Sequence, residues 1–475
     1  MTTRTKIATL LAVLGGVALA AALLVVLLWP EGEEFRLVPV TRPQGPPEAA
    51  DAHVRVGTGW GVSESPETAV RAALDMALGD PAGPPSDFAI LYATSGSDLR
   101  AILAEVRKRL GAGAKIFGGT SDVRGVMTNR GYIRVSARGY EVGMEERKRG
   151  VSVMTVTSRE IIFGTGAADF AAYPSAQEAA KAAVLQAIQS AGKTPADRPR
   201  VVLTAPTIGE EEEVLAGIET VVGRECVVLG GTVGGPKAGV FGDRDAYERG
   251  VSLAVLYTDL PLGWTFEGGF DVTEPHSGTV TRMAGQTIVE IDGRPALDVY
   301  DEWLGGRIRQ LFEEAQGKAD LVRDLLTLRP LYRKYQSSGG QDYFLFSHPW
   351  PRDPALKDRA VSTSTKIREG ERVYLSRGSW ETLVNRIGNL PRSAKVKGGI
   401  GVGARPAFGI AFICGGVLGT FPESEREKLP ILINQANGNA PFISNFTWGE
   451  QGHFPGVGNK HGNLLSSFLV IGQKG

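Results

Sequence analysis

The chain has 475 residues, of which 42% are hydrophobic and 22% charged, so it is long enough for two or more globular domains. Lys and Arg together number 52, and so do Asp and Glu, which excludes the basic composition typical of nucleic-acid-binding proteins. Only two cysteines are present, Cys226 and Cys414, so the chain is not a disulfide scaffold.

The N-terminal segment predicts a membrane anchor. Residues 7–28 carry no charge over 22 positions, which is enough for a helix to span a bilayer. Arg4 and Lys6 precede this segment and acidic residues follow it, so the positive-inside rule places residues 1–6 in the cytoplasm. A signal peptide cleaved after Ala20 is the alternative. Because the apolar run continues beyond Ala20, we expect an uncleaved single-pass anchor in the inner membrane, with the bulk of the chain extracytoplasmic.

A tether follows the anchor. Residues 29–51 are rich in proline and charge and show neither helical nor strand periodicity. Such a composition is typical of a semi-extended linker. We therefore expect the folded part of the chain to begin at residue 52.

Four short motifs occur twice, in the same order and at similar spacing. They are Gly-Thr-Gly at 57–59 and 164–166, a helix-capping serine at 65 and 175, Gly-Gly-Thr at 118–120 and 230–232, and Gly-Val-Ser at 150–152 and 250–252. A repeat of this kind predicts duplicated structural units, here over residues 54–157 and 161–258.

Each unit predicts strand, helix, strand, helix, strand and then two further strands. In the first unit the predicted strands are 54–60, 87–93, 114–118, 131–138 and 150–157, and the predicted helices are 66–78 and 97–110. In the second unit a strand over 200–205 precedes a helix over 210–222. Four glutamates open that helix, and their interaction with the helix dipole is a sufficient structural explanation for them. The expected fold class is α/β, with internally duplicated units and mixed sheets.

The paired glycines fall just after the third predicted strand of each unit. Ligands bind at this edge of open α/β sheets, and glycine lets the backbone approach a ligand closely. The alternative is a bend or close packing within the sheet. Neither a phosphate-binding G-x-x-x-x-G-K-[ST] loop nor a dinucleotide-binding G-x-G-x-x-G turn is present there.

From Gly263 the pattern changes to a separate α/β (α+β) region. Helices are expected over 296–303 and 305–327, and a β region over 343–374. A buried strand over 408–414 precedes Gly415-Gly416 and a helix that opens at Pro422, which Pro430 is expected to end or kink. A final strand is expected over 463–471. This order resembles the earlier repeat, so a degenerate third unit is expected.

Several of these segments resemble the FIST family. IFGGTSD and VLGGTVGG are similar to the FIST N-terminal domain, while GWTFEGGF, IVEIDGRPALDVYDEWLG, FICGG and FISNFTWGEQG are similar to the C-terminal domain. The resemblance implies an N-like domain over 52–260 and a C-like domain over 261–472. It also implies a sensory module that binds small ligands such as amino acids. Because no kinase, cyclase or methyl-accepting region is recognised, a partner protein is expected to carry the signal.

The resemblance also implies where the ligand binds. The G-G-[TS] segments fall on residues 118–120 and 230–232, the strand-end cysteine on Cys414 and the Gly-Glu turn on 449–450. The His-Asn pair falls on 462–463, so its histidine is lost or displaced to His461. The candidate ligand-binding residues are Gly118, Gly119, Thr120, Ser121, Gly230, Gly231, Thr232, Cys414, Trp448, Gly449, Glu450 and Asn463.

These residue types suit an amino acid or small carboxylate. Backbone N–H groups would take its carboxylate, Glu450 its ammonium group and Trp448 its side chain. No cofactor, metal ion or catalytic residue is expected, and no nucleic-acid partner.

Two other functions are compatible with the sequence. A cysteine-dependent hydrolase or transferase would use Cys414, with its pKa lowered by the following helix, together with His453 or His461 from a later loop. Glu450 and His453 also form E-x-x-H, but the helix that such metal motifs need is missing. The simpler interpretation makes Cys414 a buried apolar residue and the histidines surface-loop residues. The second alternative is a structural, membrane-tethered interaction protein.

Overall fold

The computed structural model describes residues 53–79, 86–122, 125–134, 149–273, 275–314, 319–352, 356–401 and 405–473. The predicted cytoplasmic N-terminus, anchor and tether (1–51) lie outside these residues. Among the residues that the model describes, no helix is both long and apolar enough to cross a membrane.

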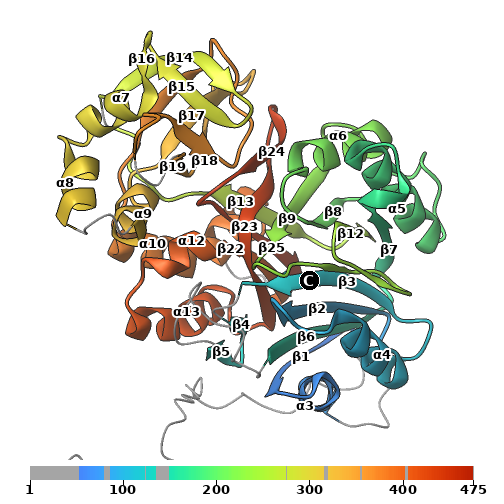
Figure 1. The fold of residues 1–475 in the computed structure, drawn as a ribbon. Coiled ribbons are helices and arrows are strands. Elements are labelled where there is room, and N and C mark those ends of the chain that lie inside the picture. Colours follow the sequence, from blue (N-terminus) through green and yellow to red (C-terminus); the bar gives the residue numbers. More distant parts are fainter. Residues whose placement is uncertain are drawn as a thin grey trace, which may run out of the picture. The chain divides into compact units, whose positions relative to one another are not determined.

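The first α/β unit is coloured blue to cyan in Figure 1. Its elements are β1 (Val54–Ser63), α3 (Pro66–Leu78), β2 (Phe88–Thr94), α4 (Leu99–Leu110), β3 (Lys115–Ser121) and β6 (Arg149–Ser158). The strands lie in the order β1-β6-β2-β3, in which β2 and β3 are parallel and the other pairs antiparallel. The short strands β4 (Gly125–Thr128) and β5 (Gly131–Arg134) follow β3 and form a hairpin.

The second unit repeats this arrangement, which confirms the predicted duplication. Its elements are β7 (Ile161–Asp169), η2 (Phe170–Ala172), α5 (Ala176–Ser190), β8 (Val201–Pro206), α6 (Glu211–Val222), β9 (Val227–Val233), β10 (Val240–Phe241), β11 (Ala246–Tyr247) and β12 (Gly250–Thr258). The strand order β7-β12-β8-β9, with β8 and β9 parallel, matches that of the first unit. The strands β10 and β11 extend the first unit's sheet beyond β3.

A third unit is present in the C-terminal half, as the sequence suggested. It consists of β13 (Leu262–Glu267), α11 (Leu390–Lys397), β22 (Pro406–Cys414), α12 (Gly415–Gly419), α13 (Glu423–Ala436), β23 (Phe442–Phe454), β24 (Gly458–Gly462) and β25 (Ser466–Gly472). The order β13-β25-β22-β23, with β22 and β23 parallel, is again the same. Because β23 also pairs with β9, the second and third units share one sheet.

Glycines on the first strand of each unit let a helix pack directly on that strand. A Cβ at Gly59 would lie 1.9 Å from the carbonyl oxygen of Ala73 in α3, and one at Gly263 would lie 2.2 Å from that of Ala394 in α11. Such distances forbid any side chain at these positions. In the second unit the corresponding glycines are Gly164 and Gly166. The repeated Gly-Thr-Gly motif is thus explained by packing.

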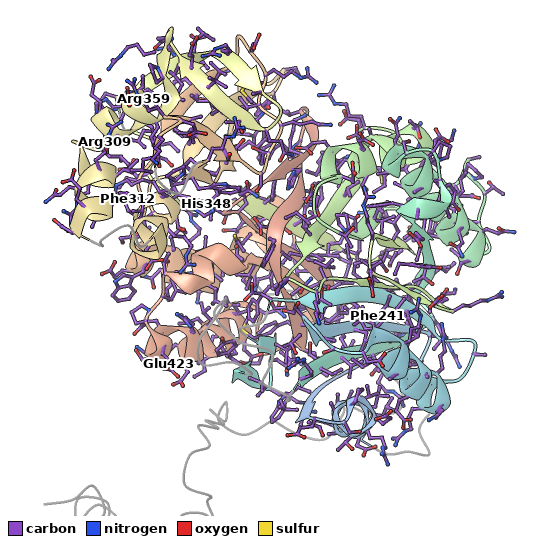
Figure 2. All side chains as sticks on the ribbon, viewed as in Figure 1. Phe241, Arg309, Phe312, His348, Arg359 and Glu423 are labelled. Atoms are coloured by element: carbon purple, nitrogen blue, oxygen red, sulfur yellow. The ribbon has the colours of Figure 1, made fainter. Side chains whose placement is uncertain are left out.

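An inserted region separates β13 from α11 and forms a further sheet (Figure 1). Its strands are β14 (Ser277–Ala284), β15 (Thr287–Ile291), β16 (Arg294–Pro295), β17 (Leu331–Gln336), β18 (Asp342–Ser347), β19 (Pro349–Pro351), β20 (Val361–Thr363) and β21 (Arg372–Leu375). Its helices are α7 (Ala296–Trp303), α8 (Arg307–Glu314) and α9 (Ala319–Thr327), and α10 (Trp380–Gly388) precedes α11. Arg309 of α8 and Arg359 of the segment before β20, both labelled in Figure 2, pair with Asp298 of α7 and so tie α7 to α8 and to that segment.

Three details of the prediction are corrected. The single helical stretch expected over 305–327 is two helices, α8 and α9. Gly415 and Gly416, which precede the helix expected from Pro422, already begin a short helix of their own, α12. The helix α13 continues past Pro430 to Ala436, because Pro430 and its neighbours Leu429 and Ile433 lie on the buried face, where packing offsets the lost backbone hydrogen bond.

Candidate functional site

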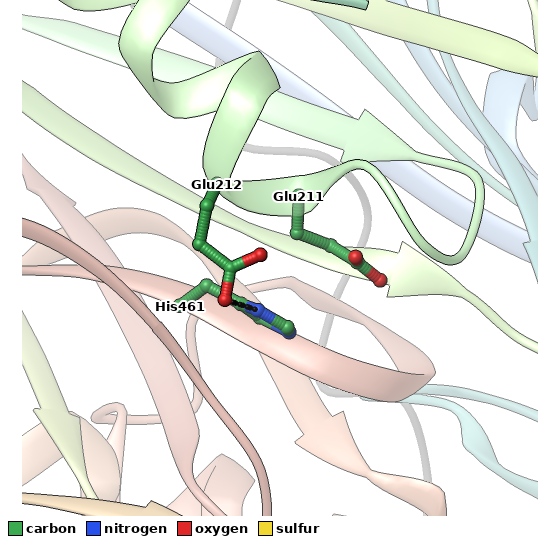
Figure 3. A group of neighbouring side chains, drawn as sticks. All are labelled: Glu211, Glu212 and His461. Atoms are coloured by element: carbon green, nitrogen blue, oxygen red, sulfur yellow. Dashed lines mark hydrogen bonds and ion pairs between the residues drawn. The ribbon is translucent and has the colours of Figure 1, made fainter. Parts of the chain in front are cut away.

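Three ionisable side chains from distant parts of the sequence meet where α6, β9 and the β23–β24 hairpin come together. Glu211 and Glu212 begin α6, and His461 lies on β24 (Figure 3). One possible ligand atom from each lies within 4.8 Å of the others. We refer to Glu211, Glu212 and His461 as the acidic cluster.

Hydrogen bonds hold each member of the acidic cluster in place. His461 Nδ1 lies 3.2 Å from Glu212 Oε1, which also accepts from the backbone N–H of Lys366 at 2.9 Å. Glu211 Oε1 accepts from Thr232 Oγ1 at 3.0 Å, and its Oε2 accepts from the backbone N–H of Gly209 at 2.9 Å. The carboxylates are therefore fixed by groups from both FIST-like halves of the sequence.

Burial makes the charges in this cluster interdependent. Glu211 is only 2% exposed, and burial raises the pKa of its carboxyl. Burial acts in the same direction on Glu212, but the hydrogen bond and the charge of His461 lower the pKa of Glu212 to about 2. Burial disfavours the imidazolium of His461, yet the surrounding glutamates raise its pKa above the usual value. Glu212 and His461 thus form an ion pair that is buried at His461 and partly exposed at Glu212, and Glu211 adds a further carboxyl group beside it.

Two polar atoms beside the cluster are buried without a hydrogen-bond partner. They are His461 Nε2 and Gln451 Oε1. Gln451 Nε2 donates to Thr232 Oγ1 at 3.1 Å, so the amide joins the same network as Glu211. A buried polar atom without a partner costs about 1 to 3 kcal/mol, so each of these atoms indicates a place for a ligand, an ion or water.

Gly449 leaves room in front of the imidazole. A Cβ at this position would lie 2.5 Å from His461 Nε2 and 3.1 Å from Thr232 Oγ1. Any side chain here would therefore cover the unpartnered nitrogen. Gly449, one of the predicted ligand-binding residues, therefore lies next to the acidic cluster.

Glu450 is wholly buried but fully bonded. Its Oε1 lies 2.7 Å from Thr447 Oγ1, and its Oε2 accepts from the backbone N–H of Leu465 at 3.1 Å. Burial raises the pKa of this carboxyl to about 8, so much of it is neutral near neutral pH. These internal contacts occupy the oxygens that we expected to bind a ligand's ammonium group.

Cys414 does not have the activated thiol that an enzyme would need. The side chain is 4% exposed, and burial together with the nearby Glu450 carboxyl raises the pKa of the thiol. The backbone N–H groups of Gly416 and Val417 in α12 do lower this pKa, as expected of a following helix, but burial outweighs them and the net shift is upward.

The histidines are not on a surface loop. His453 lies on β23 and His461 on β24, and they are 4% and 3% exposed. Since alternate residues of a strand face opposite sides, Glu450 and His453 point away from each other and the E-x-x-H spacing brings no ligands together. His453 Nδ1 instead contacts Asn459 Oδ1 at 2.9 Å.

In the first unit the predicted site residues join the units to one another. A Cβ at Gly118 would lie 2.0 Å from the Leu91 carbonyl oxygen, and one at Gly119 would lie 2.6 Å from Val233 Cγ1. Thr120 Oγ1 donates to the carbonyl of Gly234 at 3.0 Å. Ser121 Oγ in turn accepts from the backbone N–H of Phe446 at 3.1 Å. Close packing explains this glycine pair.

In the second unit only the threonine reaches the acidic cluster. A Cβ at Gly230 would lie 1.9 Å from the Thr204 carbonyl oxygen, and one at Gly231 would lie 2.1 Å from Thr447 Cγ2. Thr232 is the residue that bonds to Glu211. Thr120 and Thr232 each follow the paired glycines of their unit, and strand pairing places Thr120 opposite Ala93 and Thr447 opposite Cys414.

The remaining two predicted residues lie beside the hairpin. Trp448 Nε1 donates to Asp122 Oδ2 at 2.7 Å, which links the third unit to the first. Asn463 Nδ2 donates to the Trp448 carbonyl at 3.4 Å, and its Oδ1 accepts from the His348 N–H at 3.4 Å.

Sequence reasoning missed Glu211, Glu212 and Gln451. A signal was available for Glu211, since it lies at helical spacing from Val214, Ile218 and Val222, which are all buried. An acidic residue at this spacing lies on the apolar face of the helix and therefore points into the protein. Interaction with the helix dipole alone does not require the glutamate to be buried. Glu212 and Gln451 gave no comparable signal.

Two protein-family models match successive parts of the chain. The family model described as the FIST N domain matches residues 87–294, and that described as the FIST C domain matches residues 296–453. A search of curated proteins gave no match.

Among solved structures, cyanuric acid hydrolase from A. caulinodans has 10% sequence identity and a TM-score of 0.33, with 89% of this chain and 100% of that chain covered. PurLQS from Thermotoga maritima has 10% identity and a TM-score of 0.21, covering 90% of this chain and 75% of its own. An FtsZ dimer from M. jannaschii has 19% identity and a TM-score of 0.14, covering 22% and 26%.

Proposed function

The chain belongs to the FIST family of sensory, small-ligand-binding domains, and from this premise we propose that it is a membrane-anchored sensor of an amino acid or a similar small carboxylate. FIST sensory domains are generally non-enzymatic, and we propose the same for this chain. The residue set proposed for the ligand is Thr232, Gly449 and Gln451 together with the acidic cluster.

The buried Gln451 Oε1 is the observation on which the proposal chiefly rests. It has no hydrogen-bond partner although the residue is wholly buried, and it lies in the network that also contains Thr232 and Glu211. The ammonium group of an amino acid would donate to this oxygen. Glu450, which the sequence suggested for that role, is a poorer choice because both its oxygens have internal partners.

The location of these residues also supports ligand binding. Thr232 follows the glycine pair near the C-terminal end of β9, and Glu211 and Glu212 begin the preceding helix, α6. In α/β sheets this end of the parallel strands is where ligands bind. The Glu212 side chain is 25% exposed, so the network extends to the protein surface at that residue.

The anchor and the signalling route are further parts of the proposal. The uncharged stretch over residues 7–28 supports a membrane anchor with the FIST domains outside the cytoplasm. We propose that a partner protein receives the signal when the ligand binds.

Thermal unfolding of the purified full-length chain tests ligand binding. Each amino acid and a set of small carboxylates would be added up to millimolar concentration, and the unfolding temperature measured. A ligand at a hundredfold excess over its Kd stabilises the folded state by about 2.7 kcal/mol, which raises the unfolding temperature by several degrees. The absence of a shift with every compound would contradict the proposal and favour a structural interaction protein.

A further inference from the structure

We propose that Glu211, Glu212 and His461 form a binding site for a divalent transition-metal ion of the zinc type. The site requires no amino-acid ligand and so stands independently of the proposed function. Two carboxylates and one imidazole converge here, with one possible ligand atom from each within 4.8 Å of the others (Figure 3).

The residue types select the class of ion. Zinc is bound in proteins by imidazole nitrogen and carboxylate oxygen, with distances near 2.0 to 2.2 Å. Calcium and magnesium prefer sets made only of oxygen ligands. Three protein ligands also leave a coordination position for water or for a small molecule, as in open zinc sites.

The imidazole of His461 has the arrangement of a metal-binding histidine. Its Nδ1 contacts Glu212 Oε1 at 3.2 Å, while its Nε2 is buried and has no partner. Metal-bound histidines generally donate one ring N–H to a carboxylate, which orients the ring and leaves the other nitrogen for the metal. We therefore assign Nε2 and the Glu211 carboxylate as ligands, while Glu212 positions the ring and can offer its second oxygen.

Space and hydrogen bonding around Nε2 support this assignment. The Cβ position that Gly449 leaves vacant lies 2.5 Å from Nε2 and 3.1 Å from Thr232 Oγ1. Thr232 Oγ1 also donates to Glu211 Oε1 at 3.0 Å, so this hydroxyl fixes one of the two assigned ligands. A side chain at position 449 would block the approach of an ion to the nitrogen.

Zinc titration of the full-length chain tests the site. The protein would be treated with EDTA, dialysed and titrated with zinc sulfate by calorimetry, and bound zinc counted by mass spectrometry. We expect one zinc ion per chain. His461→Asn and Glu211→Gln should each weaken zinc affinity by at least roughly tenfold, because each removes a direct ligand.

Two matched variants control for general effects. His453→Asn removes the other buried histidine of the same hairpin, and Glu213→Gln removes a carboxylate from the same turn of α6. Both should bind zinc within about twofold of the unmodified chain. An unmodified chain that binds no zinc, or a folded His461→Asn variant with unchanged affinity, would overturn the proposal.

If the variants do not fold, X-ray absorption spectroscopy of the zinc-loaded, unmodified chain identifies the types of ligand atom bound to zinc. We expect one imidazole and otherwise oxygen ligands. A sulfur ligand, or more than one imidazole, would place the ion elsewhere and overturn the proposal. Failure of zinc binding with a retained amino-acid response would remove this site alone, whereas zinc binding without any such response would remove only the proposed function.

Discussion

The Cγ2 methyl group of Thr447 occupies the space that a side chain at Gly231 would need. A Cβ built on Gly231 lies 2.1 Å from that methyl carbon. Gly231 is on β9 of the second unit, and Thr447 is on β23 of the third. The second glycine of the pair therefore allows the two units to share one sheet, and this contact adjoins the candidate site.

Replacing Gly231 with alanine should destabilise the protein by about 2 kcal/mol or more, because the new methyl overlaps a buried one. Urea unfolding would measure the change. Gly113→Ala is the control, since a Cβ there meets nothing within 4 Å, and it should change stability by less than about 0.5 kcal/mol. The double variant Gly231→Ala, Thr447→Ser should recover part of the loss. An unaffected Gly231→Ala variant would show that the units can separate at no cost.

The hydroxyl of Thr232 should contribute to stability, whereas that of Thr204 should not. Both residues are 0% exposed, but Thr232 Oγ1 bonds to Glu211 and Gln451 while Thr204 Oγ1 has no partner. Thr232→Val should therefore cost about 1 to 3 kcal/mol, since it leaves two buried polar groups unpaired. Thr204→Val should be neutral or stabilising. Both substitutions replace a hydroxyl group with a methyl group of similar size, so chemical denaturation of the two variants compares the contributions of the hydrogen bonds. Equal changes in the free energy of unfolding would contradict the assigned hydrogen bonds.

The repeat was predictable because it depends on local signals. Glycine motifs, capping serines and apolar strands recur within each unit, and the side chain of Ser175 does accept from the N–H of Glu178 as a capping residue should. The role of the paired glycines was harder to predict. Gly119 and Gly231 are needed because Val233 and Thr447 lie against them, and both neighbours are far away in the sequence or belong to another unit.

The acidic cluster was not predictable for a related reason. Glu211 and His461 are 250 positions apart, and their approach depends on the pairing of β9 with β23 and of β23 with β24. Neither partner alone differs from a helix-capping acid or a loop histidine. Successive side chains of a strand point to opposite faces, so Glu450 and His453, three positions apart on β23, face opposite sides, and spacing counted along a presumed loop indicated the wrong pair.

Glu450 should make the folded state less stable as pH rises. Its pKa is raised from 4.5 to about 8 by burial, so the folded chain binds a proton more tightly there than the unfolded chain does. Ionisation of Glu450 therefore lowers the free energy of unfolding. This effect is absent below pH 4.5 and grows between pH 4.5 and about 8. In that window the slope is at most about 1.4 kcal/mol per pH unit.

The Glu450→Gln variant isolates this effect. Because the amide does not titrate, stability should fall less steeply from pH 5 to pH 8 in the variant than in the unmodified chain, as measured by urea unfolding at several pH values. The Glu450 carboxylate also raises the pKa values of Cys414 and His461, so the difference between the two curves includes the change at these neighbours. Parallel curves for the two proteins would show that Glu450 keeps an ordinary pKa.

Cys414 should not react with alkylating agents in the folded protein. The thiol is 4% exposed, and burial and Glu450 raise its pKa, so little of the reactive thiolate is present or accessible. Mass spectrometry after brief iodoacetamide treatment should find Cys414 unmodified under native conditions and fully modified in denaturant. Rapid labelling of the native protein at pH 7 would instead support the cysteine-dependent enzyme, because an activated thiol is already a thiolate at that pH.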